Sequence, residues 1–394
     1  MKQVSISAIV IVLLSFSANS QEKVTLQGYV KSMQTLMAPE TIGLSDVDIL
    51  SDNLIHNRLK FRYYASDNFT VAMEMRNRFL YGEITRMLPE LMQVEDYGEV
   101  LDKDRGYLDL SKTIASGKGY VLHSMIDRAY VDYVNGNFEA RLGRQRINWG
   151  INMVWNPNDI FNTMNYFDFD YEERPGTDAI KLQYYTDVAS SAELVYEAAD
   201  SWDQSAVAGM YRMNKGGYDW QMLAGYLKKD YVLGAGWSGH IDKAGFRGEA
   251  TYFRNSNNFA DTTGHLVASI SADYMFQSSL YLHGGALYNS EGSTGDVARE
   301  GQFLSNQQLS VKTLTPAKSS LFLQMRYQFT PLLTGAISAI VNPHDESFFL
   351  MPQITYSLSD NISMLLTSQF FSGEDGTEFG GIGQIYYLRI KWSF

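Results

Sequence analysis

The chain has 394 residues, 45% of them hydrophobic, and carries 32 Lys and Arg against 44 Asp and Glu, a formal net charge of −12. Such an acidic balance argues against a nucleic-acid partner, and the lack of cysteine excludes disulfides, thiolate metal sites and a lipid-modified cysteine anchor. The mean hydropathy of −0.22 is typical of a soluble protein. A barrel with a polar interior has a similar average, because its lipid-facing residues stand only at alternate positions.

Residues 1–20 have the layout of a secretory signal peptide. Lys2 precedes an apolar run over residues 8–14, and small residues follow up to Ser20. We expect cleavage after Ser20, which leaves residues 21–394 as one domain. The apolar run is too short to cross a bilayer as a helix, and no later stretch reaches the roughly 20 apolar residues that a membrane helix needs.

From residue 24 onwards, apolar and polar residues alternate in segments whose length is close to the roughly 9–11 residues of a tilted membrane strand. This pattern predicts an all-β fold, a transmembrane antiparallel β-barrel of about 18 strands. The expected strands are 24–34, 55–65, 69–81, 125–135, 137–149, 177–186, 191–199, 205–214, 218–228, 231–239, 245–254, 265–275, 280–288, 320–329, 333–341, 348–358, 362–371 and 384–394. A count of 16 stays open, because the segments 191–199 and 231–239 are short.

Short turns and long loops alternate between these segments. The short turns contain Asn-Gly, Lys-Gly-Gly and Asp-Asn, whose residues tolerate the positive φ angles of hairpins. The long connections are 82–119, with a short helix expected near 84–92, and 150–176, 289–318 and 372–383. With an even strand count both ends of the chain lie on the short-turn side, and the last strand pairs with the first. Closure of this kind removes the exposed edge of the final strand.

The last strand presents one aromatic and apolar face, formed by Tyr386, Leu388, Ile390, Trp392 and Phe394. This ending resembles the insertion signal of Gram-negative outer-membrane barrels, which the barrel-assembly machinery recognises. The segment "ARLGRQRINWG" at 140–150 is similar to the Gly-Arg-Gln strand of porin and polysaccharide-export barrels, and the whole mature chain resembles an outer-membrane porin-like protein.

The resemblance implies several properties. The protein would reside in the outer membrane of a bacterium, in contact with its lipid and lipopolysaccharide, with periplasmic short turns and extracellular long loops. It would form a passive or weakly selective channel for small hydrophilic solutes, without a cofactor. An export channel for an acidic polysaccharide is a variant of this function, and a non-transporting barrel that serves as a scaffold for surface machinery is an alternative.

The strand pleat predicts which charged residues line the pore. If Leu59, Phe61 and Tyr63 face lipid, their neighbours face inward, and the same rule applies on adjacent strands. The inner face then carries Lys31, Arg58, Lys60, Arg62, Glu74, Arg76, Arg78, Arg128, Asp132, Glu139, Arg141, Arg389 and Lys391. Stacked cations of this kind favour anions. The same charges could instead only brace the wall as ion pairs worth roughly 0–1 kcal/mol each, and both interpretations stay open.

The loop 150–176 combines aromatic residues with carboxylates. Its candidate residues are Trp155, Asp159, Asp168, Asp170, Glu172, Glu173 and Arg174. Three hypotheses fit this composition: a constriction that folds into the barrel opposite the basic wall, an outer lid that packs on itself with loosely held Ca²⁺ at its acidic groups, or an aromatic platform for a sugar.

Enzyme signatures are weak, so we expect no enzyme. The six histidines are dispersed without H-E-x-x-H spacing. The segment "GWSGH" at 236–240 resembles G-x-S-x-G but has His240 in place of the final Gly. An outer-membrane hydrolase that uses Ser238 with His265 or His283 is the remaining catalytic alternative.

Overall fold

The computed structural model describes residues 23–40, 49–104, 106–163, 166–170, 176–260, 263–295 and 310–394. The predicted signal peptide and the candidates Glu172, Glu173 and Arg174 lie outside the described residues. Within those ranges, no helix has the length and apolar character needed to cross a membrane.

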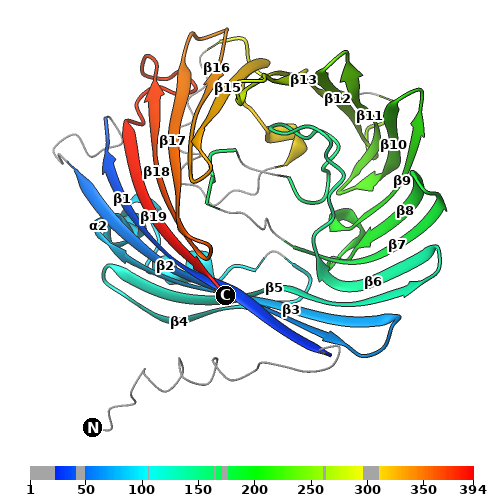
Figure 1. The fold of residues 1–394 in the computed structure, drawn as a ribbon, viewed down its shortest axis with the longest axis horizontal. Helices are drawn as coiled ribbons and strands as arrows, with labels where there is room; N and C mark the ends of the chain where they lie inside the picture. The colour runs from blue at the N-terminus through cyan, green and yellow to red at the C-terminus, as the bar shows by residue number, and fades with distance from the viewer. Residues whose placement is uncertain are drawn as a thin grey trace.

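One sheet of 19 strands makes up most of the described chain. In chain order the strands are β1 Val24–Ala38, β2 Leu50–Tyr64, β3 Phe69–Gly82, β4 Ser111–Gly117, β5 Tyr120–Asn135, β6 Phe138–Gln145, β7 Thr177–Asp187, β8 Ser190–Glu197, β9 Ala206–Lys215, β10 Tyr218–Leu227, β11 Asp230–Ile241, β12 Ala244–Asn255, β13 His265–Met275, β14 Leu280–Asn289, β15 Ser319–Thr330, β16 Leu333–Val341, β17 Phe348–Ser359, β18 Ile362–Ser372 and β19 Gln384–Ser393. All of them except β4 form a closed antiparallel barrel (Figure 1), so the predicted count of 18 is confirmed and the alternative of 16 is wrong.

The barrel closes between its first and last strands. β1 and β19 pair from Tyr29 opposite Ser393 to Ala38 opposite Gln384. The backbone of Gly28 exchanges two hydrogen bonds of 2.9 Å with Phe394. A Cβ on Gly28 would lie 2.9 Å from the Phe394 ring, so the glycine leaves the space in which the final aromatic packs. The last strand therefore has no free edge.

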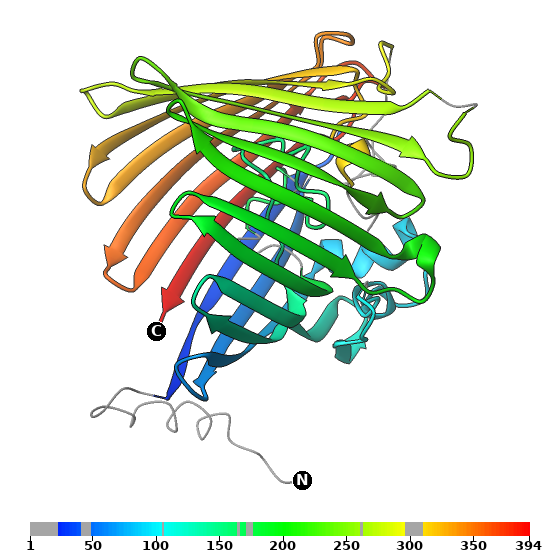
Figure 2. The same ribbon diagram turned by 90° about the vertical axis from the view of Figure 1, so that its right-hand side faces the viewer.

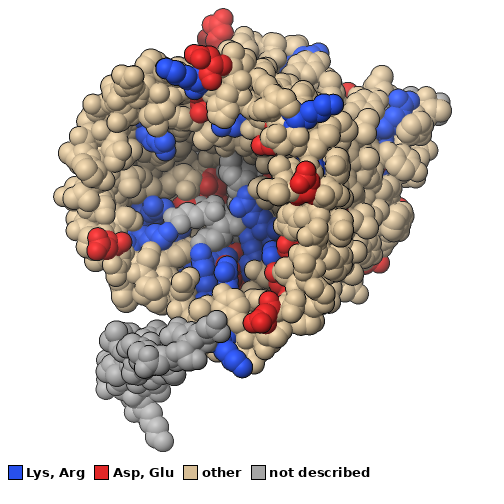
Figure 3. All heavy atoms as spheres, turned by 45° about the vertical axis from the view of Figure 1, so that its right-hand side comes forward, with Lys and Arg blue, Asp and Glu red and all other residues tan. Residues whose placement is uncertain are grey.

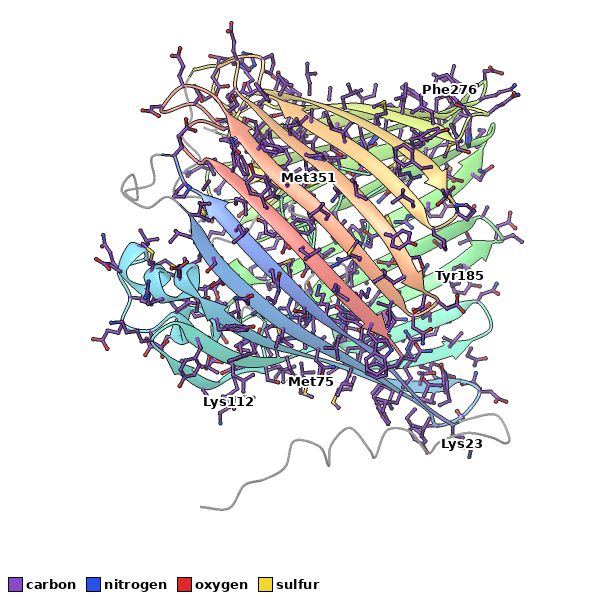
Figure 4. The ribbon with its side chains drawn as sticks, turned by 60° about the vertical axis from the view of Figure 1, so that its left-hand side comes forward. Lys23, Met75, Lys112, Tyr185, Phe276 and Met351 are labelled. Carbon is purple, nitrogen blue, oxygen red and sulfur yellow. The ribbon has the colours of Figure 1, made fainter. Side chains whose placement is uncertain are left out.

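The two ends of the barrel differ in the length of their connections. Figure 2 shows the start of β1 and the C-terminus at the same end, and Figure 4 places Tyr185 and Phe276 at this short-turn end with Lys112 toward the other. The long-loop end has one exception, a two-residue turn between β10 and β11. Lys228 and Lys229 there have φ of 47° and 79°, as a type I′ hairpin turn requires.

The connection between β3 and β5 contains α2 Glu83–Leu91, α3 Tyr97–Leu101 and β4, which extends the sheet by pairing with β5 from Ser111 opposite Met125 to Gly117 opposite Tyr120. The helix expected near 84–92 is confirmed, whereas the strand β4 was not expected. Arg144 of β6 anchors this excursion through an ion pair of 2.6 Å to Asp104, and a second ion pair of 2.8 Å joins Arg144 to Asp178 of β7. The excursion thereby covers an arginine that strict alternation directs away from the lumen.

Candidate functional site

Basic residues from both ends of the sequence meet on the inner face of β19, β1, β2, β3 and β5, because these strands are neighbours in the closed sheet. Lys391 lies opposite Lys31, and Lys31 opposite His56 on the next strand. Arg58 likewise lies opposite Arg76. We call this surface the basic wall. Figure 3 shows the barrel hollowed, with Lys and Arg atoms gathered in the hollow.

Arg58 is the best buried cation of the basic wall. It is 0% exposed and forms ion pairs of 2.8 Å with Glu74 and 2.7 Å with Asp127. Asp127 also lies 3.7 Å from Arg128. The register between β3 and β5 shifts at this point, so that Asp127 has no cross-strand partner and bulges. Strict alternation from Arg128 would put Asp127 on the outer face, which is why sequence reasoning missed it.

A second ion-pair network lies on β5, β6 and β7. Arg141 binds Asp132 at 2.9 Å and Glu139 at 3.2 Å, and Lys181 binds Glu139 at 2.9 Å. The Arg141 guanidinium also lies 4.5 Å from the centre of the Tyr130 ring, in cation–π contact. Lys181 was not among the predicted residues, although its spacing on β7 would have placed it on the same face.

Three lysines surround the ring of Tyr29 on the inner wall. Their ammonium groups lie 4.5 Å (Lys391), 5.5 Å (Lys31) and 6.0 Å (Lys60) from the ring centre. The negative face of the ring attracts these cations, which would otherwise repel one another. Arg62, two residues beyond Lys60 toward the short-turn end, is exposed.

Arg76 and Arg78 are half-buried and continue the wall on β3. Arg76 contacts the sulfur of Met125 at 3.3 Å, and Arg78 contacts Nδ1 of His123 at 3.3 Å. Met125 and His123 both belong to β5, so these contacts fix the two guanidinium groups against the neighbouring strand.

The segment 146–163 that follows β6 runs inside the barrel, where Figure 1 shows it crossing the lumen. We call it the lumen loop. Its backbone is held by polar side chains that point inward from the wall, and Gln221 of β10 donates to the carbonyl of Trp149 at 2.9 Å. Asp159, fully buried, accepts a bond of 3.2 Å from the backbone N–H of Trp149. Trp155 packs edge-on against Phe322, with 6.2 Å between ring centres.

Glu249 of β12 is the main anchor of the lumen loop. Its carboxylate, 1% exposed, accepts hydrogen bonds from the backbone N–H groups of Ile151, Asn152 and Asn158, the last at 2.9 Å. Three donors satisfy a charge that would otherwise be costly to bury. Gly236 on the adjacent strand leaves room for this fit, because a Cβ there would lie 2.8 Å from the Ile151 side chain.

The segment 166–170, which we call the strap, crosses from an apolar side of the lumen to the basic wall. Phe167 packs in a cluster of aromatic rings, and its carbonyl accepts a bond of 2.8 Å from Gln369. Phe169 lies edge-on to Tyr387, with 4.7 Å between ring centres. Asp170 then forms ion pairs on the basic wall, whereas Asp168 is exposed.

The apolar side of the lumen was not foreseen from the sequence. Its core is built by inward-facing residues of β15, β17 and β18 together with residues of two long-loop segments. These are Phe322, Phe349, Phe371, Phe379, Ile382, Val311 and Leu314. The apolar residues at alternate inward positions, such as Phe349 and Met351, are the signal that could have indicated it. The lumen is therefore asymmetric, with this apolar cluster on β15, β17 and β18 directly beside the basic wall that begins at β19.

The hypothesis of an outer lid and that of a constriction differ in where the loop packs. Among the described residues, the lumen loop and the strap contact inward-facing side chains of β10, β12, β13, β15 and β17–β19. The strap reaches the basic wall itself and does not lie only opposite to it. A cavity of about 340 Å³ remains at the short-turn end, between Asn148, Ile151 and Arg212 among other residues.

The catalytic alternative does not assemble in the described part of the chain. Ser238 lies opposite Arg247 in the sheet, whereas His265 lies opposite Phe253 and His283 opposite Asp273. His265 instead contacts Asn289 at 2.6 Å. No group of three or more His, Cys, Asp or Glu within the described ranges is placed to hold a metal ion.

Comparisons with known proteins identify the fold. No family model and no curated protein matches the sequence. Among solved structures, OccAB1 of Acinetobacter baumannii is similar over 95% of this chain and 97% of its own, with a TM-score of 0.56 and 10% identity. The outer membrane protein OprD of Pseudomonas aeruginosa gives 0.56 and 10% over 95% and 94%. OccK11 (OpdR) of the same organism gives 0.54 and 9% over 95% and 96%. The chain therefore has the 18-stranded barrel fold of these proteins over almost its whole length.

Proposed function

We propose that the chain is a porin-like channel of the bacterial outer membrane that passes small hydrophilic solutes and favours anions. The observation that carries this proposal is the basic wall. On the inner face of five neighbouring strands, cations outnumber the carboxylates Glu74, Asp127 and Asp132. Barrels of 16–18 strands are wide enough for an aqueous channel, and a lumen lined by one sign of charge concentrates counter-ions.

The outer surface supports a position within lipid. Large apolar side chains are exposed at alternate positions on many strands, for example Leu233 at 64%, Leu323 at 61% and Leu142 at 60%. An aqueous environment would make such a surface prone to association, whereas a bilayer stabilises it. We place the short turns in the periplasm and the long loops outside the cell, as is general for such barrels.

Processing and assembly belong to the same proposal. Residues 1–20 would be removed on export, and 21–394 would form one barrel domain. On the last strand, Ile390, Trp392 and Phe394 are 45%, 47% and 38% exposed on the outer face. The barrel-assembly machinery would bind these side chains before the barrel closes. Lipid and lipopolysaccharide would surround them afterwards. The channel needs no cofactor, and loosely bound Ca²⁺ at the acidic loops stays a prediction.

The ion pairs on the wall support a division of roles among the predicted pore residues. We assign Arg58, Arg128 and Arg141, each within an ion-pair network, to bracing. Lys60, Arg62, Arg76, Arg78 and Lys391 are half-buried or exposed, and we assign them to contact with solutes. The lumen loop and the strap act as the constriction.

Swelling of proteoliposomes tests the proposal. Liposomes with the refolded barrel are placed in isotonic solutions of a small uncharged sugar or of a monocarboxylate of similar size. We expect swelling in both, and faster swelling with the carboxylate, because the basic wall attracts it. Liposomes with heat-unfolded protein are the control. A folded, inserted barrel that causes no swelling in either solution would contradict the proposal.

A further inference from the structure

We infer that the outer face of β1, β2, β3 and β5 is a contact surface for a second copy of this chain within the membrane. Five uncharged polar side chains stand there at outward positions, which on strands such as β11 and β15 carry apolar residues. We call them the polar patch: Ser32, Gln34, Asn57, Asn77 and Ser124. Figure 4 shows part of this wall, with β1 and β2, from the outside. The inference concerns the lipid side of the barrel and goes beyond the proposed channel function.

The strand alternation directs the polar patch outward. On β2 and β3, Asn57 and Asn77 are the chain neighbours of Arg58 and Arg76, which face the lumen. Successive side chains of a strand point to opposite faces, so the two asparagines face outward. The register places Asn57 opposite Asn77, and Asn77 opposite Ser124. Three neighbouring strands therefore carry polar groups side by side on the outer face.

The polar patch lies at the depth of the apolar band. On β1, Ser32 is exposed and lies opposite the lipid-facing Ile390, and Gln34, also exposed, lies two residues farther along. On β3 and β5, the exposed rings of Tyr81 and Tyr120 lie beyond the patch toward the long-loop end. Aromatic rings of this kind form the girdle at the edge of the bilayer. The patch is therefore on the hydrocarbon side of that girdle.

Hydrogen bonds within the barrel use only part of the polar patch. Ser124 donates to Oδ1 of Asn77 at 2.7 Å, and Asn77 donates to Oδ1 of Asn57 at 3.2 Å. Asn57 donates to the carbonyl of Tyr29 at 3.1 Å. Each asparagine keeps a second N–H, and Gln34 has no side-chain hydrogen bond to any described residue. Lipid chains offer no donors or acceptors, so these groups favour a protein surface that does.

The stagger of the strands sets the depth of each polar group. β1 extends past the end of β19 toward the short-turn end, so a register row rises from β19 toward β5. With a strand tilt of about 35–45°, each step to the next strand raises the row by about 3 Å. Two residues along a strand raise the position by about 5 Å.

This geometry gives the polar patch two matching arms. Asn57, Asn77 and Ser124 share one register row, and Ser32 and Gln34 lie two and four residues beyond that row on β1. Ser32 and Asn77 therefore reach nearly the same depth in the bilayer, and so do Gln34 and Ser124. One arm lies on β1 and the other on β3 and β5, with β2 between them.

A second copy of the chain fits these two arms. Around a two-fold axis along the membrane normal, each arm meets the other arm of the second copy, as in any isologous contact. Gln34 then faces Ser124 of the second copy, and Ser32 faces Asn77. Amides and hydroxyls both donate and accept hydrogen bonds, so the patch is complementary to itself. A patch of like charges would repel its own copy.

Crosslinking tests the contact in a chain that has no native cysteine. A variant with both Gln34→Cys and Ser124→Cys is treated with a short bifunctional maleimide in the outer membranes of expressing cells. We expect a covalent dimer, and about tenfold less of it with either single variant, because the two residues lie on different arms. The matched control combines Gln34→Cys with Leu233→Cys, at an exposed outward position of the distant strand β11. No covalent dimer in the double variant, or no more than in the control, would overturn the inference.

A second measurement separates contact from bracing. Ser32→Ala with Gln34→Leu leaves the hydrogen bonds among Asn57, Asn77 and Ser124 intact. We expect this double variant to weaken dimerisation about tenfold, measured by energy transfer between labelled barrels in vesicles as the lipid-to-protein ratio is raised. Its stability in urea should be unchanged or higher, because an amide leaves the lipid-facing surface. Lower stability with unchanged dimerisation would show that the patch braces the barrel and would contradict the contact.

Conductance of the same preparations distinguishes this surface from the channel. A wild type that conducts but stays monomeric at every lipid ratio contradicts only the contact surface. The same holds if Gln34→Cys crosslinks to a different protein while no covalent dimer forms with Ser124→Cys. An inserted barrel that dimerises but does not conduct contradicts the proposed function and supports the contact.

Discussion

At the scale of single residues, the inner wall is organised by burial of charge. Arg58 is fully buried and forms ion pairs with both Glu74 and Asp127, so one positive and two negative side chains lie together inside the wall. A buried pair adds little net stability over apolar packing, but the loss of one partner leaves the others uncompensated. When a charged residue of the wall is mutated, the loss in free energy of unfolding should therefore depend on how deeply the residue is buried and not on its charge alone.

We predict that Arg58→Met destabilises the folded barrel by about 3–5 kcal/mol, because Glu74 and Asp127 remain buried without their common cation. Arg62→Met, at an exposed position four residues later, should change stability by no more than about 1 kcal/mol. Urea unfolding in lipid vesicles, followed by tryptophan fluorescence, measures both. Equal destabilisation by the two variants would count against this account of the wall.

At the scale of elements, the lumen loop depends on one carboxylate. Glu249 gathers N–H groups from both sides of a turn in the loop, and the amide of Gln would offer one acceptor oxygen in place of two. We predict that Glu249→Gln loosens the loop and increases the open-channel current noise severalfold, with little loss of the barrel itself. Single-channel recording measures the noise. The control is Asp242→Asn, which lies in an exposed turn between β11 and β12. Current noise that is unchanged in Glu249→Gln would show that other contacts fix the loop.

The strands were predictable from the sequence because alternation and turn residues are local signals. The 18 expected segments match the 18 barrel strands, with differences at their ends: β1 continues to Ala38, and β6 ends at Gln145. The bulge at Asp127, the covering of Arg144 by the excursion and the pairing of β4 depend on contacts between distant segments, which periodicity does not report.

The candidate site was predictable in part. The pleat brought the basic residues of β19, β1, β2 and β3 to one face, since pairing of the first and last strands follows from closure. The path of the lumen loop was not determined by its composition, because the same aromatic and acidic residues suit a lid equally well. Its anchors, Glu249 and Gln221, lie 98 and 72 residues away in sequence from the loop residues that they bind and show no pattern that links them to the loop.

At the scale of the whole molecule, the chain separates its charges in space. The net charge of −12 belongs to the entire sequence, whereas the interior of five strands is predominantly basic. The apolar cluster on β15, β17 and β18 lies directly beside the basic wall, which begins at β19. A solute would therefore experience the local field of the wall and not the average charge of the protein.

The central claim is an open pore whose selectivity is set by the basic wall, and the reversal potential of the refolded protein in a planar bilayer under a KCl gradient tests it most directly. We predict stable conductance with anion preference that falls when Arg62, Arg76 and Arg78 are all changed to Gln. A triple Gln variant of Lys112, Lys118 and Lys243, which are exposed and lie outside the barrel strands or in its turns, should keep the wild-type potential. No conductance from inserted barrels, or a potential that the wall variant leaves unchanged, would contradict the account.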